Sequence, residues 1–549
     1  MTTVPAIVVP KTGIGAYSTP SMLARFLVSW AVRSPEDVAL DPCTGDGIFM
    51  EHAADRLVFL GLQGSLANHL VGVEIDEKRA DDTSLKLQLR YGTAPKIIPR
   101  GFFGILGSQR PSSFDAVVGN PPFARYRDFV PKNERELAFR FLADFGFKPS
   151  KMTNAWVPFL VAAIHLLKPK GRLAMVLPAE LLQVSYAAPI REYLHTRFGF
   201  INVVSFNKLV FPSVEQEVVL LMGTKGEGRG LHLIEYQDAS DLELLHKFHV
   251  PQEPVQDSKE KWTQFFLSDV QRSTLRETLG NPRIKRLGEI ASVDVGVVTG
   301  FNHFFILDRE LIQKWGIESR YLVPVVARTA ATTGVTFSKE EWRKGRALYL
   351  LVVKREQTIS RNLRKYIAKG EREKVNKGYK CSLRDRWYSV PYVWTPDAFL
   401  FRQIGALPRI VLNKTNTTCT DTIHRVLFKN KKQSSTIVSC FYNSLTIACA
   451  EMFGRSYGGG VLELMPSEAE KLPIPLVGDG RALDEIDRLV REGSPLDAIK
   501  VGDEQILHEE FGLPRATIST IRDAWVSLSK RRKRRYVGQS EVKANLLIQ

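Results

Sequence analysis

Cysteine is scarce in this chain of 549 residues and follows no recognisable spacing. The five cysteines are scattered, and none belongs to a CxxC pair. This argues against a zinc site and against a disulfide framework. Cysteines used in this way favour a reducing, intracellular compartment.

Long hydrophobic runs are also lacking. The longest apolar run, around residues 156–167, is too short to cross a bilayer. The first residues show no charged-then-apolar pattern of the kind that directs secretion. We therefore expect a cytoplasmic protein that has no membrane partner.

Acidic residues are fewer than basic ones. Asp and Glu number 59 against 76 Lys and Arg, which gives a formal net charge of +17. Such a surplus favours a polyanionic partner such as nucleic acid. The chain is also too long for a single hydrophobic core, so two or three domains are expected.

The order of patterns along the chain predicts three regions. Residues 1–230 alternate β-rich runs with helical patterns, which is typical of a parallel, doubly wound α/β sheet. A glycine-rich, charged stretch at 223–230 suits a boundary. Residues 231–478 hold many short β-like runs among aromatic and basic residues, and 479–549 become helical and basic. We expect a mixed α+β second domain and a helical C-terminal tail.

Two motifs in the first region follow predicted strands. In DPCTGDG (41–47), Gly45 and Gly47 permit a tight turn and close approach of a ligand to the backbone. VGVEID (71–76) follows one βα unit later, and Glu74 at its strand end can accept hydrogen bonds from ribose hydroxyls. Neither motif alone excludes a structural turn or an exposed carboxylate at a helix start.

A third motif, GNPPF (119–123), ends the apolar run FDAVVG. Two prolines cannot continue a central strand, because they donate no ladder hydrogen bonds. The Asn120 side-chain carbonyl and the Pro121 backbone carbonyl form paired acceptors that suit an NH₂ group. Phe123 could stack on a flat ring that carries this amine. A proline-rich loop without function remains the alternative for this motif taken alone.

The order of these motifs resembles that of the γ-class, TaqI-type N6-adenine DNA methyltransferases. YSTP (17–20), DPCTGDG, VGVEID, GNPPF and VFPSVEQEVVLL (210–221) follow one another as in that family. GVVTGFNHFFIL and GGGVLELMPSEAEKLPIP resemble segments near the start and end of the family's target-recognition domain. The similarity covers most of residues 10–476, and it implies a Rossmann-like class I methyltransferase sheet followed by a DNA target-recognition domain.

The resemblance implies a role for each matching residue. Cofactor binding would fall to Thr19, Pro20, Asp41, Pro42, Gly45, Gly47, Glu74, Ile75, Phe102 and Asn120. Within this set, Thr19 and Pro20 would line the methionine end of S-adenosyl-L-methionine, and Ile75 would pack on its adenine. Catalysis would fall to Asn120, Pro121, Pro122 and Phe123. Phe123 and Phe211 would stack on a flipped-out target adenine, and no metal is implied.

One position departs from the family pattern. Members usually carry Asp-Phe after the third strand, where the acid meets the amine of the cofactor adenine. Here the sequence offers Gly101-Phe102. The residue that replaces this acid cannot be identified from the sequence.

The second region should contact double-stranded DNA. Arg384, Arg386, Trp387 and Tyr388 combine charge with aromatic surface, although an exposed strand with solvated arginines would look the same. KRRKRR (530–535) would add phosphate contacts or form a solvated helix end. The leading hypothesis is a sequence-specific adenine methyltransferase that acts as a monomer or weak dimer beside a separate cognate restriction endonuclease.

Three alternatives remain. A protein glutamine methyltransferase also uses an NPP-type loop, but it needs no large basic second domain. A fused nuclease and methylase would need a PD…ExK cluster, which the sequence does not show convincingly. A non-catalytic DNA-binding protein that retains the fold would not need intact NPPF and DPxxGxG motifs.

Overall fold

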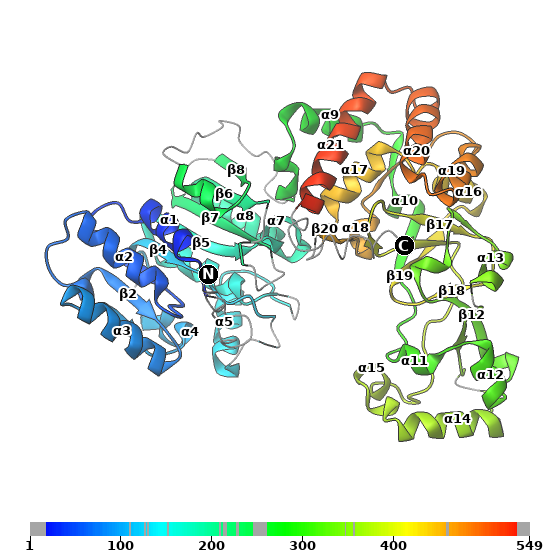
Figure 1. Ribbon diagram of the computed structural model, residues 1–549, viewed down its shortest axis with the longest axis horizontal. Coiled ribbons are helices and arrows are strands. Elements are labelled where there is room, and N and C mark those ends of the chain that lie inside the picture. The colour runs from blue at the N-terminus through cyan, green and yellow to red at the C-terminus, as the bar shows by residue number, and fades with distance from the viewer. Residues whose placement is uncertain are drawn as a thin grey trace, which may run out of the picture. The chain divides into compact units, whose positions relative to one another are not determined.

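The computed structural model describes residues 18–108, 111–125, 128, 131–150, 153–207, 210–211, 217–226, 230–244, 261–345, 347–354, 357–456 and 460–534. It divides into two compact units (Figure 1). Unit 1 ends at Phe266, and unit 2 runs from Leu267 to Lys533.

Unit 1 is built on an eight-stranded sheet with the order β3-β2-β1-β4-β5-β7-β6-β8. Its strands are β1 (Ala39–Asp41), β2 (Leu70–Val73), β3 (Lys96–Ile98), β4 (Phe114–Gly119), β5 (Leu167–Pro178), β6 (Phe198–Phe206), β7 (Val218–Lys225) and β8 (Gly230–Tyr236). Strands β1 to β5 are mutually parallel, and β7 alone runs antiparallel to its neighbours. The predicted α/β sheet is confirmed.

Eight α-helices accompany this sheet among the described residues of unit 1. They are α1 (Ser21–Ala31), α2 (Ile48–Phe59), α3 (Glu77–Tyr91), α4 (Phe102–Ile105), α5 (Lys132–Asp144), α6 (Trp156–Leu166), α7 (Glu180–Gln183) and α8 (Ala188–Arg197). Helix α6 is apolar on nearly all sides and is almost fully buried, as its sequence requires. The central strands are buried on both faces, which explains their continuous apolar runs.

Two features of the sheet are not evident from the sequence pattern. Strand β7 lies between β5 and β6 in the interior of the sheet. The segment 198–206, which forms β6, pairs with both β7 and β8. The boundary placed at residue 230 coincides with the first residue of β8, and the compact unit continues to Phe266 because β8 is the last strand of this sheet.

Unit 2 contains several small sheets instead of one large one. A five-stranded sheet has the order β10 (Ala291–Val295), β19 (Ile423–Phe428), β15 (Ala398–Phe401), β17 (Ile410–Asn413) and β13 (Thr336–Phe337). A four-stranded sheet has the order β11 (Ile306–Leu307), β14 (Tyr349–Leu351), β12 (Leu322–Val326) and β18 (Thr418–Cys419). The smaller sheets are formed by β16 (Gln403–Ile404), β21 (Leu462–Glu463) and β20 (Arg455–Ser456), and by β22 (Pro473–Pro475) with β9 (Ile284–Arg286).

The helices of unit 2 are mostly short in its first part and longer towards its end. They are α9 (Asp269–Leu279), α10 (Leu287–Ile290), α11 (Asn302–Phe305), α12 (Arg309–Trp315), α13 (Lys339–Lys344), α14 (Arg361–Arg372), α15 (Tyr379–Ser382), α16 (Ser434–Ser439), α17 (Ser444–Phe453), α18 (Pro466–Ala469), α19 (Ala482–Arg491), α20 (Pro495–Val501) and α21 (Arg515–Arg534). A π-helical stretch, Gly502–Glu510, follows α20. The mixed α+β character expected after the first domain is present.

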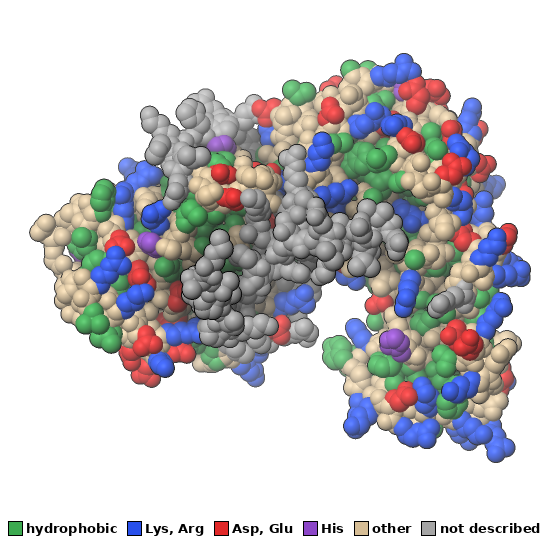
Figure 2. All heavy atoms as spheres, viewed as in Figure 1, with side chains coloured by type: hydrophobic (Ala, Val, Ile, Leu, Met, Phe, Trp, Pro, Cys, Tyr) green, Lys and Arg blue, Asp and Glu red, His purple; other side chains and the backbone are tan. Residues whose placement is uncertain are grey.

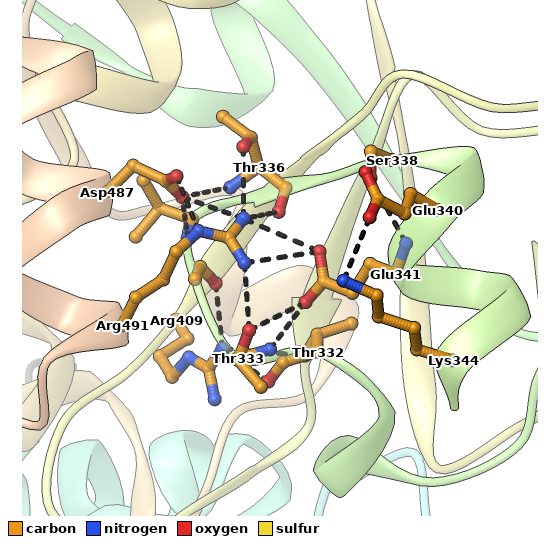
Figure 3. A network of polar contacts seen from close by, with 12 residues as sticks. Thr332, Thr333, Thr336, Ser338, Glu340, Glu341, Lys344, Arg409, Asp487 and Arg491 are labelled. Carbon is orange, nitrogen blue, oxygen red and sulfur yellow. Dashed lines mark hydrogen bonds and ion pairs between the residues drawn. The ribbon is translucent and has the colours of Figure 1, made fainter.

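The helices after residue 479 pack against the sheets of unit 2 through a polar network (Figure 3). Asp487 on α19 accepts hydrogen bonds from the backbone N–H groups of Val335 and Thr336, at 2.6 and 2.8 Å. Arg491, one helical turn later, donates to the Thr336 carbonyl at 2.7 Å and to the Thr333 hydroxyl at 2.8 Å. Helix α19 is therefore joined to β13, and residues 479–533 belong to the same compact unit as the sheets.

No single helix in the described parts of the chain is both long and apolar enough to cross a membrane. The segments Lys431–Ser439 and Ser444–Phe453 meet the length and composition limits only when taken together, and an 86° bend separates them. Nearly all residues of α17, which forms the second segment, are buried within the protein.

Candidate active site

The glycine turn and the NPPF motif meet where the strand order of unit 1 reverses. Strand β1 pairs with β2 on one side and with β4 on the other, both in parallel. In an open α/β sheet, ligands bind at such a switch point, outside the carboxyl ends of the strands. DPCTGDG leaves β1 there, and GNPPF leaves β4 beside it.

The turn after β1 is shaped by its glycines. Gly45 and Gly47 have positive φ angles of 60° and 82°, which disfavour side chains at these positions. Gly47 also begins α2 so close to α3 that an added Cβ would lie 2.5 Å from Thr83 Cγ2. The absence of side chains at these positions lets the turn pack closely against Glu74 and against α3.

Asp41, the last residue of β1, is an almost fully buried carboxyl group. Its Oδ1 accepts a hydrogen bond from the Cys43 backbone N–H at 3.1 Å. Its Oδ2 and the Thr44 hydroxyl are both buried and have no hydrogen-bond partner among the described residues. Burial raises the pKa of Asp41 to about 8, and the neighbouring Glu74 and Asp46 carboxylates also raise it. The hydrogen bond from Cys43 acts in the opposite direction and lowers the pKa.

The Cys43 thiol lies in the same turn. Burial raises its pKa well above the ordinary value, and the Asp41 and Glu74 carboxylates raise it further. A thiol in such surroundings stays protonated, and the protonated form is a poor nucleophile. This environment does not suit Cys43 to covalent catalysis.

Glu74 joins the turn after β1 to the turn after β2. Its carboxylate accepts hydrogen bonds from the Gly45 N–H at 2.7 Å and from the Asp76 N–H at 2.9 Å. The side chain is 7% exposed. The adjacent Ile75 is 50% exposed, so it presents apolar surface at the same strand end.

The end of β4 lies against the Asp41 turn. An added Cβ on Gly119 would lie 2.9 Å from Asp41 Oδ1, so a glycine is needed for this approach. Immediately afterwards, the Asn120 amide nitrogen donates to the Thr19 hydroxyl at 3.1 Å. This hydrogen bond brings together Thr19 and Asn120, two predicted site residues that belong to different motifs. Pro121 and Phe123 are buried beyond them.

Phe102 lies buried in α4, after β3, and its ring stacks on Phe159 with centroids 5.5 Å apart. A carboxylate that the sequence does not predict lies next to it. Glu134, in the first turn of α5, accepts hydrogen bonds from the N–H groups of Phe103 and Gly104. No local pattern around Glu134 indicates this contact, because it joins segments about thirty positions apart.

The remaining predicted residues are placed as follows. Pro20 precedes α1, and Pro42 is buried in the turn after β1. Phe211 is also buried, and residues 212–216 after it lie outside the described residues, as does Tyr17 of the YSTP motif. The joint role of Phe123 and Phe211 on a target base stays a prediction.

The four residues predicted to contact DNA differ in exposure. Arg384 donates to the backbone carbonyls of Val298 and Thr299, both at 2.8 Å, so it holds a loop of unit 2 together. Trp387 packs on Phe304, with centroids 5.0 Å apart, and Tyr388 packs on Trp387. Arg386 is exposed.

The basic run near the end of α21 also contains a structural residue. Arg532 is buried and forms an ion pair with Glu451, with Nη2 to Oε1 at 2.8 Å and Nε to Oε2 at 2.9 Å. Arg532 is therefore not placed to contact phosphate. Lys530, two residues earlier, is exposed.

Two family models match this chain over adjoining ranges. The family model described as N-6 DNA Methylase matches residues 9–268. The model described as Type II methyltransferase M.Eco57I, C-terminal domain, matches residues 259–507. The type II methyltransferase M.AccI of Acinetobacter calcoaceticus is 22% identical over 87% of this chain and 88% of its own length. M.XamI of Xanthomonas campestris pv. amaranthicola is 24% identical over 84% of this chain and 85% of its own.

The chain belongs to the N6-adenine DNA methyltransferases of restriction–modification systems. Two solved structures share the fold of this methyltransferase. The structure of a DrdV–DNA complex aligns with 87% of this chain, with a TM-score of 0.52 and 13% sequence identity. A nuclease-deletion mutant of LlaGI, in complex with a DNA substrate mimic, also covers 87%, with a TM-score of 0.54 and 12% identity. The methyltransferase spans about half the length of each.

Proposed function

We propose that the carboxyl edge of the unit 1 sheet binds S-adenosyl-L-methionine and that the Asn120 loop presents the N6 amine of a target adenine to it. The observation that carries this proposal is the convergence of the three motifs. Gly119 approaches the Asp41 carboxylate, and Asn120 donates to Thr19. The motif order further supports a γ-class enzyme.

The residues at this edge fit the cofactor. Asp41 Oδ2 is a buried acceptor without a partner among the described residues, and a cationic ammonium would supply its donor. Glu74 is held by two backbone N–H groups and keeps acceptor capacity for ribose hydroxyls. When bound, S-adenosyl-L-methionine supplies an electrophilic methyl group on a positively charged sulfonium.

Asn120 and Pro121 prepare the target amine. The Asn120 amide nitrogen faces Thr19, so its carbonyl oxygen points to the other side of the amide. This oxygen and the Pro121 carbonyl accept the two N6 protons of adenine. Holding both protons would favour a pyramidal nitrogen whose lone pair is aligned for in-line displacement. The N–C bond would form as the S–C bond breaks, and the methylated nitrogen would then release one proton to water. The two acceptors also stabilise the positive charge that develops on N6, so positioning and electrostatics carry the rate.

The adenine amine is inaccessible inside a duplex, so the base is flipped out before transfer. Phe123 then stacks on the exposed ring, and Phe211 covers its other face. Both aromatic side chains are buried in unit 1 and would give the base an apolar environment.

Unit 2 supplies sequence recognition on double-stranded DNA. Figure 2 shows Lys and Arg side chains gathered over the part of unit 2 that contains α14. On this helix, Leu363, Tyr366 and Ile367 are buried, while the outward positions carry Arg361, Arg364, Lys365 and Arg372. Such a basic surface, with Arg386, suits phosphate contacts. We further propose that the enzyme acts as a monomer or weak dimer and that a separate endonuclease shares its site.

Incubation with labelled S-adenosyl-L-methionine and plasmid DNA, followed by nucleoside analysis, tests this function. N6-methyladenine at one repeated sequence is the expected product. N4-methylcytosine would overturn the assignment of the target base. If the label appears in protein and not in DNA, the proposed DNA methylation is wrong and glutamine methylation becomes the better interpretation.

A further inference from the structure

Helix α4 begins with a glycine where a side chain normally caps the helix. Gly101 is the N-cap, and no side chain at this position can accept the free N–H groups of the first turn. Those N–H groups are nevertheless bonded. Phe103 N–H donates to Glu134 Oε2 at 2.9 Å, and Gly104 N–H donates to Glu134 Oε1 at 3.0 Å.

The Glu134 carboxylate occupies the space that a side chain at position 101 would fill. An added Cβ on Gly101 would lie 1.9 Å from Glu134 Cδ and 2.1 Å from Oε1. An N-cap Asp would bond the N–H groups at the second and third helical positions, which are Phe103 and Gly104. Glu134 therefore delivers from α5 the carboxylate that Gly101 lacks.

This carboxylate lies at the carboxyl end of β3, one strand from Glu74. Strands β2 and β3 are paired, with Val73 opposite Ile98, and the Glu74 N–H donates to the Ile98 carbonyl at 3.1 Å. Glu134 is 6% exposed, so the protein keeps an ionisable group almost out of water here. A buried carboxylate is costly unless it is hydrogen-bonded.

The Glu134 carboxylate can accept more hydrogen bonds than the two that cap α4. Each carboxylate oxygen takes one backbone N–H and has a second acceptor site. Beside it, Phe102 stacks on Phe159 with ring centroids 5.5 Å apart, so the surroundings of the carboxylate are aromatic and apolar. An acceptor in such surroundings suits an aromatic ring that carries an exocyclic amine.

We propose that Glu134 accepts a hydrogen bond from the exocyclic amine of the cofactor adenine and thereby selects adenosine over inosine at the cofactor site. The inference rests on the proposed function, because it assumes that the ribose lies at Glu74. With the ribose there, the base extends over the neighbouring end of β3. A carbonyl oxygen in place of the amine would face the carboxylate and be repelled.

Calorimetric titration with S-adenosylhomocysteine and S-inosylhomocysteine tests this selection. We expect wild-type protein to prefer the adenosine form by about 10- to 100-fold, as one hydrogen bond to a charged group allows. Glu134→Ala should bring this ratio close to one, because the adenosine form loses a hydrogen bond and the inosine form is no longer repelled by the carboxylate. Glu136→Ala, which removes an exposed carboxylate from the same helix, should leave the ratio unchanged.

A variant with the carboxylate moved to position 101 distinguishes a role in selecting adenosine from a role in folding. In the double variant Gly101→Asp with Glu134→Ala, the steric conflict is removed and an acid caps α4 from its own N-cap. The adenosine preference should return to within a few-fold of wild type. A purely structural role for Glu134 predicts equal weakening of both ligands, and that result would overturn the inference while leaving the cofactor site intact. If wild-type protein binds neither nucleoside, the proposed function fails as well.

Discussion

The Asn120 side-chain nitrogen donates to the hydroxyl of Thr19 across 3.1 Å, although the two residues are 101 positions apart in the chain. This hydrogen bond fixes which way the Asn120 amide is turned. It places the donor end towards Thr19 and thus directs the acceptor end to the opposite side, where the proposed target amine is bound.

Replacing Thr19 by Val should lower kcat, because the amide then loses the acceptor that orients it. We expect a loss of about tenfold, equivalent to about 1.4 kcal/mol in the barrier. The KM for DNA should change little. Thr19→Ser keeps the hydroxyl and should retain most of the activity. Steady-state kinetics on plasmid DNA measures both variants, and equal losses in Val and Ser variants would contradict the orienting role.

Cofactor binding should depend on pH through Asp41. Burial raises the pKa of Asp41 to about 8. The carboxyl group is therefore protonated near neutrality in the free protein. Binding of a cationic ammonium favours its ionised form, so binding releases a proton and affinity rises as the pH increases toward 8. The cofactor affinity should change by at most about tenfold per pH unit.

The same group affects folding with the opposite pH trend. Between pH 3.8, the ordinary pKa of an aspartate, and about pH 8, the folded protein binds more protons at Asp41 than the unfolded chain does. Stability from this group is thus lost as the pH rises through that interval. Asp41→Asn should remove both dependences. Calorimetric Kd values and unfolding midpoints across the interval test this, and an unchanged slope in the variant would rule out Asp41 as the titrating group.

Arg384 and Arg386 should respond differently to truncation. Arg384 bonds two backbone carbonyls of its own unit, so Arg384→Ala should mainly lower the stability of unit 2. Arg386 is exposed, and Arg386→Ala should weaken DNA binding and reduce the salt dependence of the affinity by about one phosphate contact. Fluorescence anisotropy at several salt concentrations measures this. A steeper or unchanged salt dependence in Arg386→Ala would exclude the phosphate contact.

Two substitutions in the basic run at the end of α21 can be compared directly. Arg532→Ala leaves Glu451 as a buried, unpaired charge and should destabilise unit 2 by about 3–5 kcal/mol. Lys530→Ala changes an exposed residue of the same helix and should cost less than about 0.5 kcal/mol. Chemical denaturation followed by tryptophan fluorescence compares the two. Similar stabilities of these variants would show that the buried ion pair contributes little.

Much of unit 1 is predictable from the sequence because its signals are local. The apolar run that ends at Gly119 predicts β4, and the prolines after Asn120 predict where the strand stops. The glycines after Asp41 predict a turn, and the structure gives them positive φ angles. These residues act through their immediate neighbours in the chain.

The remaining features depend on contacts between distant segments. The place of β7 inside the sheet follows from pairing with β5 and β6, which periodicity does not encode. Glu134 reaches Gly101 from another helix, and Arg532 in a basic run is neutralised by Glu451 on α17. Charge and spacing along the sequence do not reveal such partners.

Asn120→Ala tests the central claim most directly. The variant and wild-type protein are given labelled S-adenosyl-L-methionine and plasmid DNA, and N6-methyladenine and the cofactor Kd are measured in the same preparations. Asn68→Ala, an exposed position in unit 1, is the matched control. We predict that Asn120→Ala forms no detectable N6-methyladenine, binds the cofactor within a few-fold of wild type, and differs in this from the active control. Methylation at the wild-type rate in Asn120→Ala would contradict the assignment of Asn120 to the target amine.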